Sequence, residues 1–384
     1  MIIRLISPYG RRLNRVITSL QIRRSWKNTV ECSANRARCW TDIDLSVIAQ
    51  NYKNALELCS SQLIPVLKAD AYGMGAVKVA KLLASYGAKM FAVATHMEAI
   101  ELLDALECDV LVMGMSGECE IDEAIERGII MTVFSFEQAK KISERAGKKA
   151  ARVHFKVDTG LHRLGFNDMQ EMEAASRLPG LKIEGLFSHL ALRDRANDEA
   201  QYALLMQAKA ILNPPMVHIV DSIGMVRYPQ WQLDGARIGA WLYGVCPKRF
   251  DRPHLTRCPA TFCARIAQIR TVKAGECVGY DEEHPLEKDS VIATLAVGYA
   301  DGYPRLNSVG EVEINGQRAK VAGLVCMDQM MVDITGIEGV REGDVAILLG
   351  GSIGIDEYAS WDKMNRNEAL SRLNGRAPRF YTGG

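Results

Sequence analysis

The chain has 384 residues, a formal net charge of +1 and the mix of apolar and charged residues that is usual in globular proteins. This length predicts two domains, or one large domain with an appendage. The balanced charge gives no sign of nucleic-acid binding, and no apolar run reaches the roughly 20 residues that a membrane helix needs.

Residues 1–38 are set apart by their charge. Nine basic residues precede Trp40, against the single acid Glu31. This bias is typical of a transit peptide, but it equally fits a basic tail that follows a membrane helix, or a start placed too far upstream. A secretory signal is not expected, because no compact apolar segment is present. We therefore interpret residues 1–38 as a basic N-terminal extension of unknown role.

From Trp40 onward, short apolar runs alternate with stretches of helical spacing. The runs are Leu63–Leu67, Met90–Ala94, Asp109–Met113, Ile129–Phe134, Val153–Val157, Ile183–Phe187, Met216–Val220 and Leu233–Ile238. Helical spacing is clearest in Ser46–Cys59, Ala76–Ser85, Glu120–Arg127, Glu137–Arg145 and Glu199–Leu212. Eight strand–helix units in about 220 residues favour a (β/α)8 TIM barrel over an open doubly wound sheet. The sequence predicts this barrel over residues 39–258.

After about Pro259 the helical spacing stops. The expected strands are Phe262–Val272, Val291–Val297, Val312–Ile314, Ala319–Val325, Met330–Ile334 and Val345–Leu349. Asn315-Gly316 between two of them is a strong signal for a two-residue hairpin. A second, all-β C-terminal domain is therefore expected over residues 259–384.

Reactive side chains follow several of the barrel strands. Lys68 comes directly after the first apolar run, His189 after the sixth and Ser222 after the seventh, while Arg237 lies in the eighth. Catalytic groups of TIM barrels sit where the strands end, so these four residues are expected on one rim. A lone lysine at a strand end is usually a solvated charge, but in a pocket its neutral amine can bond covalently to a carbonyl carbon.

Several motifs together resemble the alanine racemase family, whose members bind pyridoxal 5'-phosphate (PLP). They are Val66-Leu-Lys-Ala-Asp-Ala-Tyr-Gly-Met-Gly75, Lys156-Val-Asp-Thr-Gly-Leu-His-Arg-Leu-Gly165, Asp234-Gly-Ala-Arg-Ile-Gly239, Val297-Gly-Tyr-Ala-Asp-Gly-Tyr-Pro304 and Cys326-Met-Asp-Gln329. They occur in family order over roughly nine-tenths of the chain. The resemblance implies a PLP-dependent racemase that supplies D-alanine for peptidoglycan, built as a homodimer.

The resemblance implies two opposed catalytic bases. Lys68 would hold PLP and exchange the Cα proton on one face, and Tyr280 would work on the other face. Two bases suit racemisation, because one base tends to return the proton to the side it left. A chain from Tyr280 through His189 to Arg237 is expected to lower the pKa of the phenol. Arg237 would also face the pyridine nitrogen of PLP.

Other family positions match residues around the cofactor and the substrate. Tyr72, Ser222 and the backbone amide of Gly239 would contact the phosphate, and His189 would pack on the ring. Arg163 would orient the phenolic oxygen of PLP and the substrate carboxylate. Lys156 matches a lysine that is often carbamylated in the family. A last group would act on the site from the partner subunit: Tyr280, Tyr299, Met327 and Asp328.

The chain departs from the family pattern at two places. Asp221 stands before Ser222 where the family has asparagine, and a carboxylate there would repel phosphate unless it is paired or turned away. Asn367 stands where alanine racemases usually have a tyrosine that contacts the phosphate and crowds the substrate. Serine-racemising relatives of the vancomycin-resistance type also have asparagine there. Asn367 thus predicts serine racemisation beside alanine, with neutral drift as the alternative.

Three other readings stay open. Another barrel-type PLP enzyme, such as a decarboxylase or D-threonine aldolase, would share the lysine but lack the Tyr280 motif and an arginine opposite the ring nitrogen. A PLP-binding carrier protein without turnover would lack the second β-domain. An aldolase that uses Lys68 without PLP would purify colourless.

Metal binding is not expected. The ten cysteines form no CxxC pair and have no zinc-like spacing with a histidine, which predicts free thiols in a reducing cytoplasm. Asp281-Glu-Glu-His284 is interpreted as a solvated loop. His96, His154 and His162 have no partner at ligand spacing and are expected to be structural.

Overall fold

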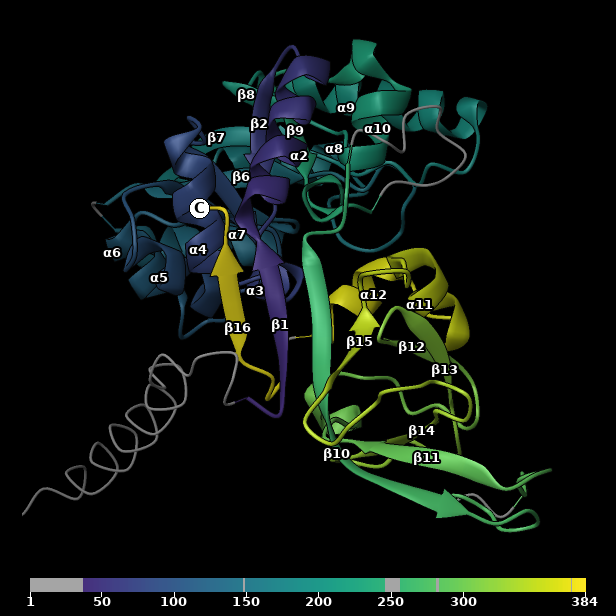
Figure 1. Ribbon diagram of the computed structural model, residues 1–384. Helices are drawn as coiled ribbons and strands as arrows, with labels where there is room; N and C mark the ends of the chain where they lie inside the picture. The colour runs from purple at the N-terminus through teal and green to yellow at the C-terminus, as the bar shows by residue number, and fades with distance from the viewer. Residues whose placement is uncertain (1–36, 148, 246–255, 281–282, 374) are drawn as a thin grey trace, which may run out of the picture. The chain divides into compact units, whose positions relative to one another are not determined.

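The computed structural model describes residues 37–147, 149–245, 256–280, 283–373 and 375–384. Residues Cys39–Gly384 form one compact unit. Within it the strands make two eight-stranded sheets, one parallel and one largely antiparallel (Figure 1). The expected class, a parallel αβ barrel followed by a mostly-β domain, is confirmed. The basic extension predicted at 1–38 lies outside the described residues except for its last two.

The parallel sheet closes into a barrel. Its strands are β2 (Gln62–Pro65), β3 (Met90–Val93), β4 (Asp109–Val112), β5 (Ile130–Val133), β6 (Ala151–Lys156), β7 (Leu181–Phe187), β8 (Met216–His218) and β9 (Gly235–Ile238). Their order is β2-β9-β8-β7-β6-β5-β4-β3. A parallel bridge between Val66 and Ala92, with the Leu67 amide 2.8 Å from the Ala92 carbonyl, joins the two outer strands. All eight predicted runs are barrel strands.

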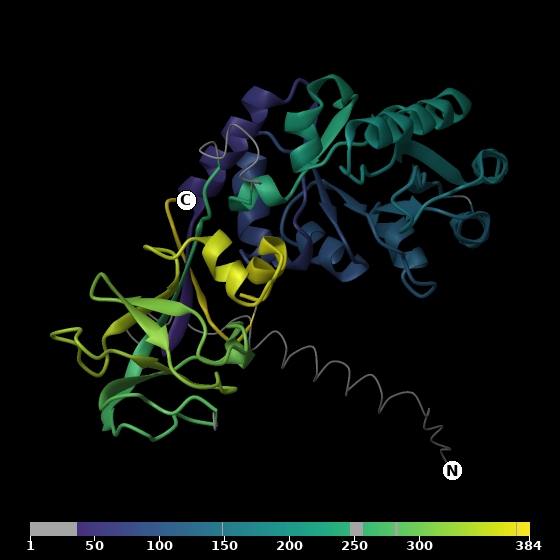
Figure 2. The ribbon, with the colours of Figure 1, turned by 90° about the vertical axis from the view of Figure 1, so that its right-hand side faces the viewer.

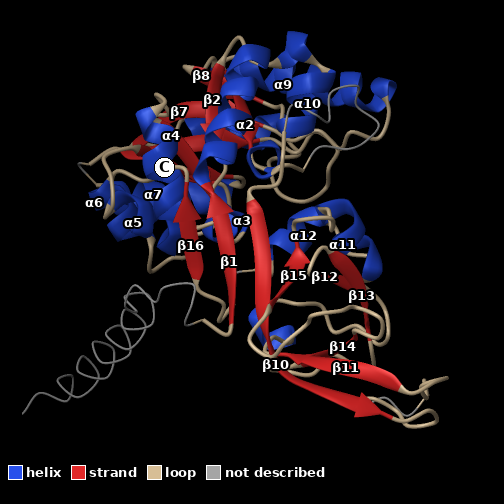
Figure 3. Ribbon diagram, viewed as in Figure 1, coloured by secondary structure: helices blue, strands red, loops and turns tan. Residues whose placement is uncertain are grey.

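Helices cover the outside of this sheet (Figure 3). They are α2 (Leu45–Leu58), α4 (Ala76–Ser85), α5 (His96–Leu103), α6 (Ile121–Arg127), α7 (Phe136–Ala146), α8 (Met169–Ser176), α9 (Arg195–Leu212) and α10 (Ser222–Arg227). The short segment α3 (Lys68–Tyr72) directly follows β2 and has left-handed backbone angles from residue 69 to residue 72. Side-chain caps start many of the helices; Ser135 and Asp194, for example, accept a backbone N–H of the first turn. The α4 helix shows the packing rule, since Val79, Ala80 and Leu83 are all buried at helical spacing. Two short 3-10 helices follow, η2 (Pro229–Trp231) and η3 (Ala240–Tyr243).

The second sheet draws on both ends of the chain. Its order is β11-β14-β13-β12-β15-β10-β1-β16, and β1 (Cys39–Asp44) pairs antiparallel with β10 and parallel with β16 (Figures 1 and 2). The other members are β10 (Ala260–Val272), β11 (Ser290–Leu295), β12 (Glu311–Ile314), β13 (Gln317–Val321), β14 (Met330–Asp333), β15 (Val345–Leu349) and β16 (Arg379–Thr382). The range 39–258 expected for the barrel includes β1, whereas the pairing of β1 places it in the second sheet. A local pattern cannot reveal a partner more than 200 residues away.

The β12–β13 hairpin turns at Asn315-Gly316 as predicted. Ile314 pairs with Gln317, and both turn residues have positive φ, 50° for Asn315 and 74° for Gly316. A two-residue turn of this kind requires positive φ at both positions, which Asn and Gly tolerate best.

The expectation of an all-β second domain is wrong in one respect. Two short helices, α11 (Ile355–Trp361) and α12 (Arg366–Ser371), lie between β15 and β16. The α12 helix packs against α3, the segment that begins at Lys68. The second domain therefore reaches the segment after Lys68 through a helix as well as through Arg379 of its last strand, which lies 2.6 Å from Asp70.

The described cysteines are free thiols, and no described helix is long and apolar enough to cross a membrane. The described residues also contain no cluster of three or more potential metal ligands. Asp281 and Glu282 of the loop that was considered for metal binding lie outside the described residues.

Candidate active site

Four of the predicted residues come together where the barrel strands end. Lys68 follows β2, His189 follows β7, Ser222 follows β8, and Arg237 lies within β9. Because the strands are parallel, these residues lie at the same end of the barrel. A hydrogen bond links two of them, His189 and Arg237, directly.

The backbone after Lys68 forms a single left-handed turn. Ala69, Asp70, Ala71 and Tyr72 all have φ between 53° and 55°, and Gly73 follows with φ of 84°. For L-residues this conformation costs roughly 1–2 kcal/mol per residue. Surrounding contacts must therefore hold the turn in place, as is usual for strained segments at functional sites.

The environment of Lys68 favours its neutral form. The pKa of the amine is lowered, mainly by burial and then by the positive charge of Arg163, while the negative charge of Glu98 opposes the shift. A neutral amine has the lone pair that nucleophilic attack and proton uptake both need. Arg163 itself is exposed, and its charge also acts on Lys156, His189 and Arg237.

A cradle suited to an anion lies beside the lysine. The Ser222 hydroxyl accepts the backbone N–H groups of Gly239 (3.1 Å) and Trp241 (3.2 Å), which leaves its proton free to be donated. A Cβ at position 239 would lie 2.6 Å from the Tyr72 hydroxyl, so only glycine fits. Burial, and then the charge of Asp221, raise the pKa of Tyr72 to about 12, so its phenol remains a donor. These groups fit a phosphate.

Asp221, the unexpected acid beside this cradle, has partners. Its Oδ1 accepts the backbone N–H groups of Ile223 (3.0 Å) and Gly224 (2.8 Å) and so caps α10, while its Oδ2 lies 4.0 Å from His189 Nε2. Burial raises the pKa of Asp221, and the charge of Arg237 is among the effects that oppose the rise. The carboxylate is therefore held at the start of α10 by its hydrogen bonds to the first turn.

The Arg237 guanidinium is buried and donates to five acceptors. Its two terminal nitrogens contact His218 Nδ1 (2.6 Å), the Ser188 carbonyl (2.7 Å), the Ile219 carbonyl (3.0 Å), His189 Nδ1 (3.2 Å) and the His218 carbonyl (3.3 Å). Burial lowers its pKa to about 10, which still leaves it protonated at neutral pH. None of the contacts among the described residues uses its Nε–H. That donor is available to a ring nitrogen.

These contacts fix the protonation of two imidazoles. A guanidinium can only donate, so Nδ1 of both His189 and His218 must accept and the ring proton must lie on Nε2. His218 Nε2 then donates to His154 Nδ1, 3.1 Å away. Burial, followed by Arg237, lowers the pKa of His189 and His218 well below the usual value. His189 is therefore neutral, with an N–H left to donate.

Lys156 is a buried cation among cations. Burial, followed by the charges of Arg237 and Arg163, lowers the pKa of its amine to about 7, against the opposing effect of Asp158. Its Nζ lies 4.6 Å from the centre of the Phe187 ring. No ion pair joins Lys156 to a carboxylate in the described part of the chain. A substantial fraction of this amine is neutral at pH 7.

The residues expected to act across a subunit interface form a separate group. Tyr280, Tyr299, Met327 and Asp328 all line one cavity of about 500 Å³. Tyr280 is 77% exposed and lies in a turn. Among the described residues no hydrogen bond connects Tyr280 with His189. Within the described part of the chain, neither a hydrogen bond nor a shared cavity joins Tyr280 to Lys68, the other proposed base.

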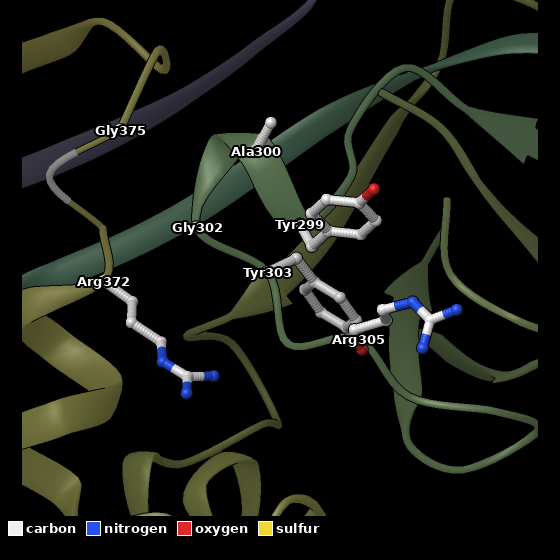
Figure 4. Close-up of a pocket in the computed structure, with 7 residues that line it drawn as sticks. All are labelled: Tyr299, Ala300, Gly302, Tyr303, Arg305, Arg372 and Gly375. Atoms are coloured by element: carbon white, nitrogen blue, oxygen red, sulfur yellow. The ribbon is translucent and has the colours of Figure 1, made fainter. Parts of the chain in front are cut away.

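A second cavity of about 340 Å³ adjoins this group, since Tyr299 and Arg305 line both. In Figure 4 its other side is made by Arg372 and Gly375, which follow α12. Asp328 is paired with Arg376, which also lies 3.3 Å from Asp301.

Asn367 lies on α12, the helix that packs against the lysine segment. Its backbone N–H donates to Asn365 Oδ1 (2.9 Å). Its side-chain Oδ1 is buried and has no hydrogen-bond partner among the described residues. A buried acceptor without a donor is costly, so a ligand hydroxyl would be a favourable partner.

Sequence reasoning missed one residue of this network, His218. His218 links Arg237 to His154, and both histidines are buried inside barrel strands. The available signal was a polar residue in an otherwise apolar strand, Met216-Val-His-Ile-Val220. His154 was interpreted as structural, which fits its lowered pKa of about 4. His162 is exposed and lies 3.9 Å from Asp158.

Comparison with known proteins identifies relatives over nearly the whole chain. Residues 43–247 match the family model "Alanine racemase, N-terminal domain", and residues 260–381 match "Alanine racemase, C-terminal domain". The chain is 36% identical over 366 residues to an alanine racemase of Clostridium novyi, covering 89% of this chain and 95% of that one. It is 34% identical over 368 residues to an alanine racemase of Methanococcus maripaludis, covering 89% and 98%.

Solved structures agree with this match. An alanine racemase of Clostridium difficile 630 has a TM-score of 0.84 at 30% identity and covers 90% of this chain and 96% of that one. An alanine racemase of Bartonella henselae with covalently bound pyridoxal phosphate has a TM-score of 0.83 at 28% identity, covering 90% and 100%.

The buried amine of Lys156 predicts a specific pH dependence of stability. Its pKa is about 7 in the folded protein and 10.5 in an unfolded chain, so between these values the unfolded state binds more protons. The free energy of unfolding should therefore increase as the pH rises from about 7 to 10.5. Lys156→Met should stabilise the protein at pH 6, and this advantage should shrink toward pH 10.

The measurement is the difference in unfolding midpoint between wild type and variant from pH 6 to pH 10, in buffer free of carbon dioxide. Lys149→Met, at an exposed lysine, is the control and should give a small difference that does not vary with pH. A pH-independent difference for Lys156→Met would show that this amine does not titrate in the window.

Proposed function

The chain belongs to the alanine racemase family, and from this premise we propose that it is a PLP enzyme that interconverts L- and D-alanine. The observation that carries the proposal is the group at the barrel rim: a lysine with a lowered pKa, a phosphate cradle and a buried arginine with one N–H left over. When bound, PLP withdraws electrons from the amino acid and makes the Cα proton acidic. The D-alanine formed would serve peptidoglycan synthesis.

The rim residues can hold each part of the cofactor. Lys68 would bond to it covalently, and the hydroxyls of Tyr72 and Ser222 would donate to the phosphate, with the space left by Gly239 beside them. The Nε–H of Arg237 would donate to the pyridine nitrogen. Because the guanidinium keeps its proton, the ring nitrogen would stay unprotonated and withdraw electrons only moderately. Rapid return of a proton to Cα is then favoured over transamination.

Two bases move the proton. Lys68 removes or returns it on one face of Cα, and Tyr280 of the partner subunit acts on the other. His189 carries an N–H on Nε2, which can donate to the phenolic oxygen and stabilise its ionised form. The link from His189 to the buried cation Arg237 supports this donor role.

We infer a homodimer because one chain supplies only part of the site. Tyr280 and Met327 are both exposed and share a cavity with Tyr299 and Asp328, away from the contacts of Lys68. A second copy could apply this surface to the barrel rim in a symmetric, two-fold arrangement. The substrate carboxylate would then lie between Arg163 of one subunit and the Met327–Asp328 segment of the other.

Isotope exchange tests the proposed reaction. L-alanine incubated with the protein in deuterated water should become racemic, with deuterium at Cα in both enantiomers. Tyr280→Phe should lose about 100- to 10,000-fold in kcat, the usual contribution of a general base. Decarboxylation, or retention of the Cα proton, would refute racemisation.

Mixed dimers test the shared site. Lys68→Ala and Tyr280→Phe subunits, each inactive alone, should recover activity when unfolded and refolded together, because each mixed dimer contains one intact site. Random pairing predicts about a quarter of the wild-type activity. Lack of recovery, with mixed dimers demonstrated by a tag, would place Tyr280 and Lys68 in the same chain's site.

The free acceptor of Asn367 favours a second substrate, serine. Its buried Oδ1 can accept the hydroxyl of a serine side chain, and an amide occupies less space than the tyrosine usual in the family. A site that satisfies a polar group prefers the substrate that carries it. We therefore propose serine racemisation beside alanine racemisation.

Two variants of Asn367 distinguish the effect of the space around the substrate from the effect of the hydrogen bond to its side chain. Asn367→Ala keeps the space and removes the acceptor, so the serine-to-alanine ratio of kcat/KM should fall about tenfold, the equivalent of one hydrogen bond. Asn367→Tyr should reduce kcat/KM for serine further, while the enzyme still turns over alanine. If the wild type does not turn over serine, or if Asn367→Ala leaves the ratio unchanged, this second function is wrong.

We also propose that Lys156 is carbamylated. Its neutral amine can attack carbon dioxide to form a carbamate and release one proton, which turns a cation among cations into an anion beside Arg163. Protein exchanged into 13C-bicarbonate should then show one carbamate carbon signal in the NMR spectrum. The signal should be absent from Lys156→Met and present in Lys149→Met; an identical spectrum for both variants would exclude the modification.

We propose the cytoplasm as the location, a choice supported by the free thiols. The carrier alternative is disfavoured by the complete second sheet, and the decarboxylase and aldolase alternatives by Arg237 and the Tyr280 motif. The colour and exchange chemistry of the purified protein distinguish these readings.

A further inference from the structure

The strained turn after Lys68 is held from outside by a glutamate on the neighbouring helix. Glu98 lies in the first turn of α5, and its Oε1 accepts the backbone N–H of Ala69 (2.7 Å). Its Oε2 accepts the N–H groups of Ala94 (2.8 Å) and Thr95 (3.1 Å). One carboxylate thus ties the segment after β2 to the segment after β3.

A comparable cap at the start of α7 shows which contacts of Glu98 belong to ordinary helix capping. In α7, Gln138 occupies the same third helical position as Glu98, and its Oε1 accepts the Phe134 amide (3.0 Å) behind a capping Ser135. A neutral glutamine is therefore enough for a cap of this kind. Its Nε2 is buried with no partner among the described residues. The contact of Glu98 with Ala69 is an addition that capping does not require.

The additional contact falls at a sensitive point. Ala69 is the first of the four left-handed residues, and it directly follows Lys68. The second residue of the turn has its own support: Asp70 accepts the Ala76 amide (2.7 Å) and pairs with Arg379 of β16 (2.6 Å). Carboxylates thus hold the first two residues of the turn.

We propose that Glu98 is a positioning residue for Lys68, whose carboxylate fixes the first left-handed residue and so sets the direction in which the lysine side chain enters the site. The inference rests on the proposed role of Lys68 as the residue that binds PLP. A misplacement of about 1 Å in such a group can cost on the order of 100-fold in rate.

The charge of Glu98 has a separate effect. The charged and titratable groups that interact electrostatically with Lys68 are Arg163, Glu98 and His189. Arg163 lowers the pKa of the amine and Glu98 raises it. Removing the negative charge should therefore lower the pKa of the Lys68 nitrogen further, also when this nitrogen is bonded to the cofactor, which a purely structural role would not do.

Two variants of the holoenzyme separate position from charge. Glu98→Gln keeps the length and the cap but turns an amide N–H₂ toward the Ala69 N–H, so the contact and the charge are both lost. Glu98→Asp keeps the charge, but its shorter side chain cannot span both segments. Glu171→Gln is the matched control, because Glu171 holds the same helical position in α8 and accepts the Phe136 amide (2.9 Å).

The readouts are kcat and KM for alanine, the pH titration of the bound cofactor's visible absorbance without substrate, and the unfolding midpoint. Both Glu98 variants should lower kcat by about ten- to 100-fold with little change in KM. Only Glu98→Gln should move the absorbance titration to lower pH, and Glu171→Gln should change neither.

The proposal is overturned if Glu98→Gln and Glu98→Asp keep the wild-type kcat and absorbance titration and lose only stability. If one variant does not fold, the other still decides the effect on kcat. A wild type without visible cofactor absorbance would instead count against the role of Lys68, so the two failures are distinguishable.

Discussion

The site depends on one buried guanidinium. Arg237 lies inside the barrel and donates to two imidazoles and three carbonyls, and burial of an unpaired charge would otherwise be prohibitive. Since a guanidinium only donates, it dictates the tautomer of His189 and His218. Its charge also lowers the pKa of Lys156. The electrostatic character of the rim therefore follows largely from this residue.

The cation and the strained turn serve the same end by different means. Arg237 fixes the two imidazoles that contact it. The left-handed segment from Ala69 to Tyr72 directs Lys68 and brings the Tyr72 phenol beside Gly239. Such a segment is stable only when its neighbours hold it. Here α5 supplies Glu98 and the last strand supplies Arg379, so two residues that are 281 positions apart in the chain stabilise one turn.

The sequence predicted features that depend on local patterns. Strand–helix alternation yielded all eight barrel strands, and Asn315-Gly316 yielded a hairpin, because both follow from backbone preferences of nearby residues. The pairing of β1 with β10 and β16, and the link from Arg237 through His218 to His154, depend on contacts between distant segments. Pattern reasoning has no access to such contacts.

The division of the proposed site follows from the geometry of racemisation. Two bases must stand on opposite faces of one carbon, and groups at the ends of parallel strands all approach from the same rim. In this chain the rim places Lys68, while Tyr280, the second proposed base, has no hydrogen bond to the rim residue His189 among the described residues. A tyrosine on a separate domain meets this need, and Tyr280 is 77% exposed on the surface that a second copy would have to cover. Dimerisation would then complete the reaction geometry as well as bury that surface.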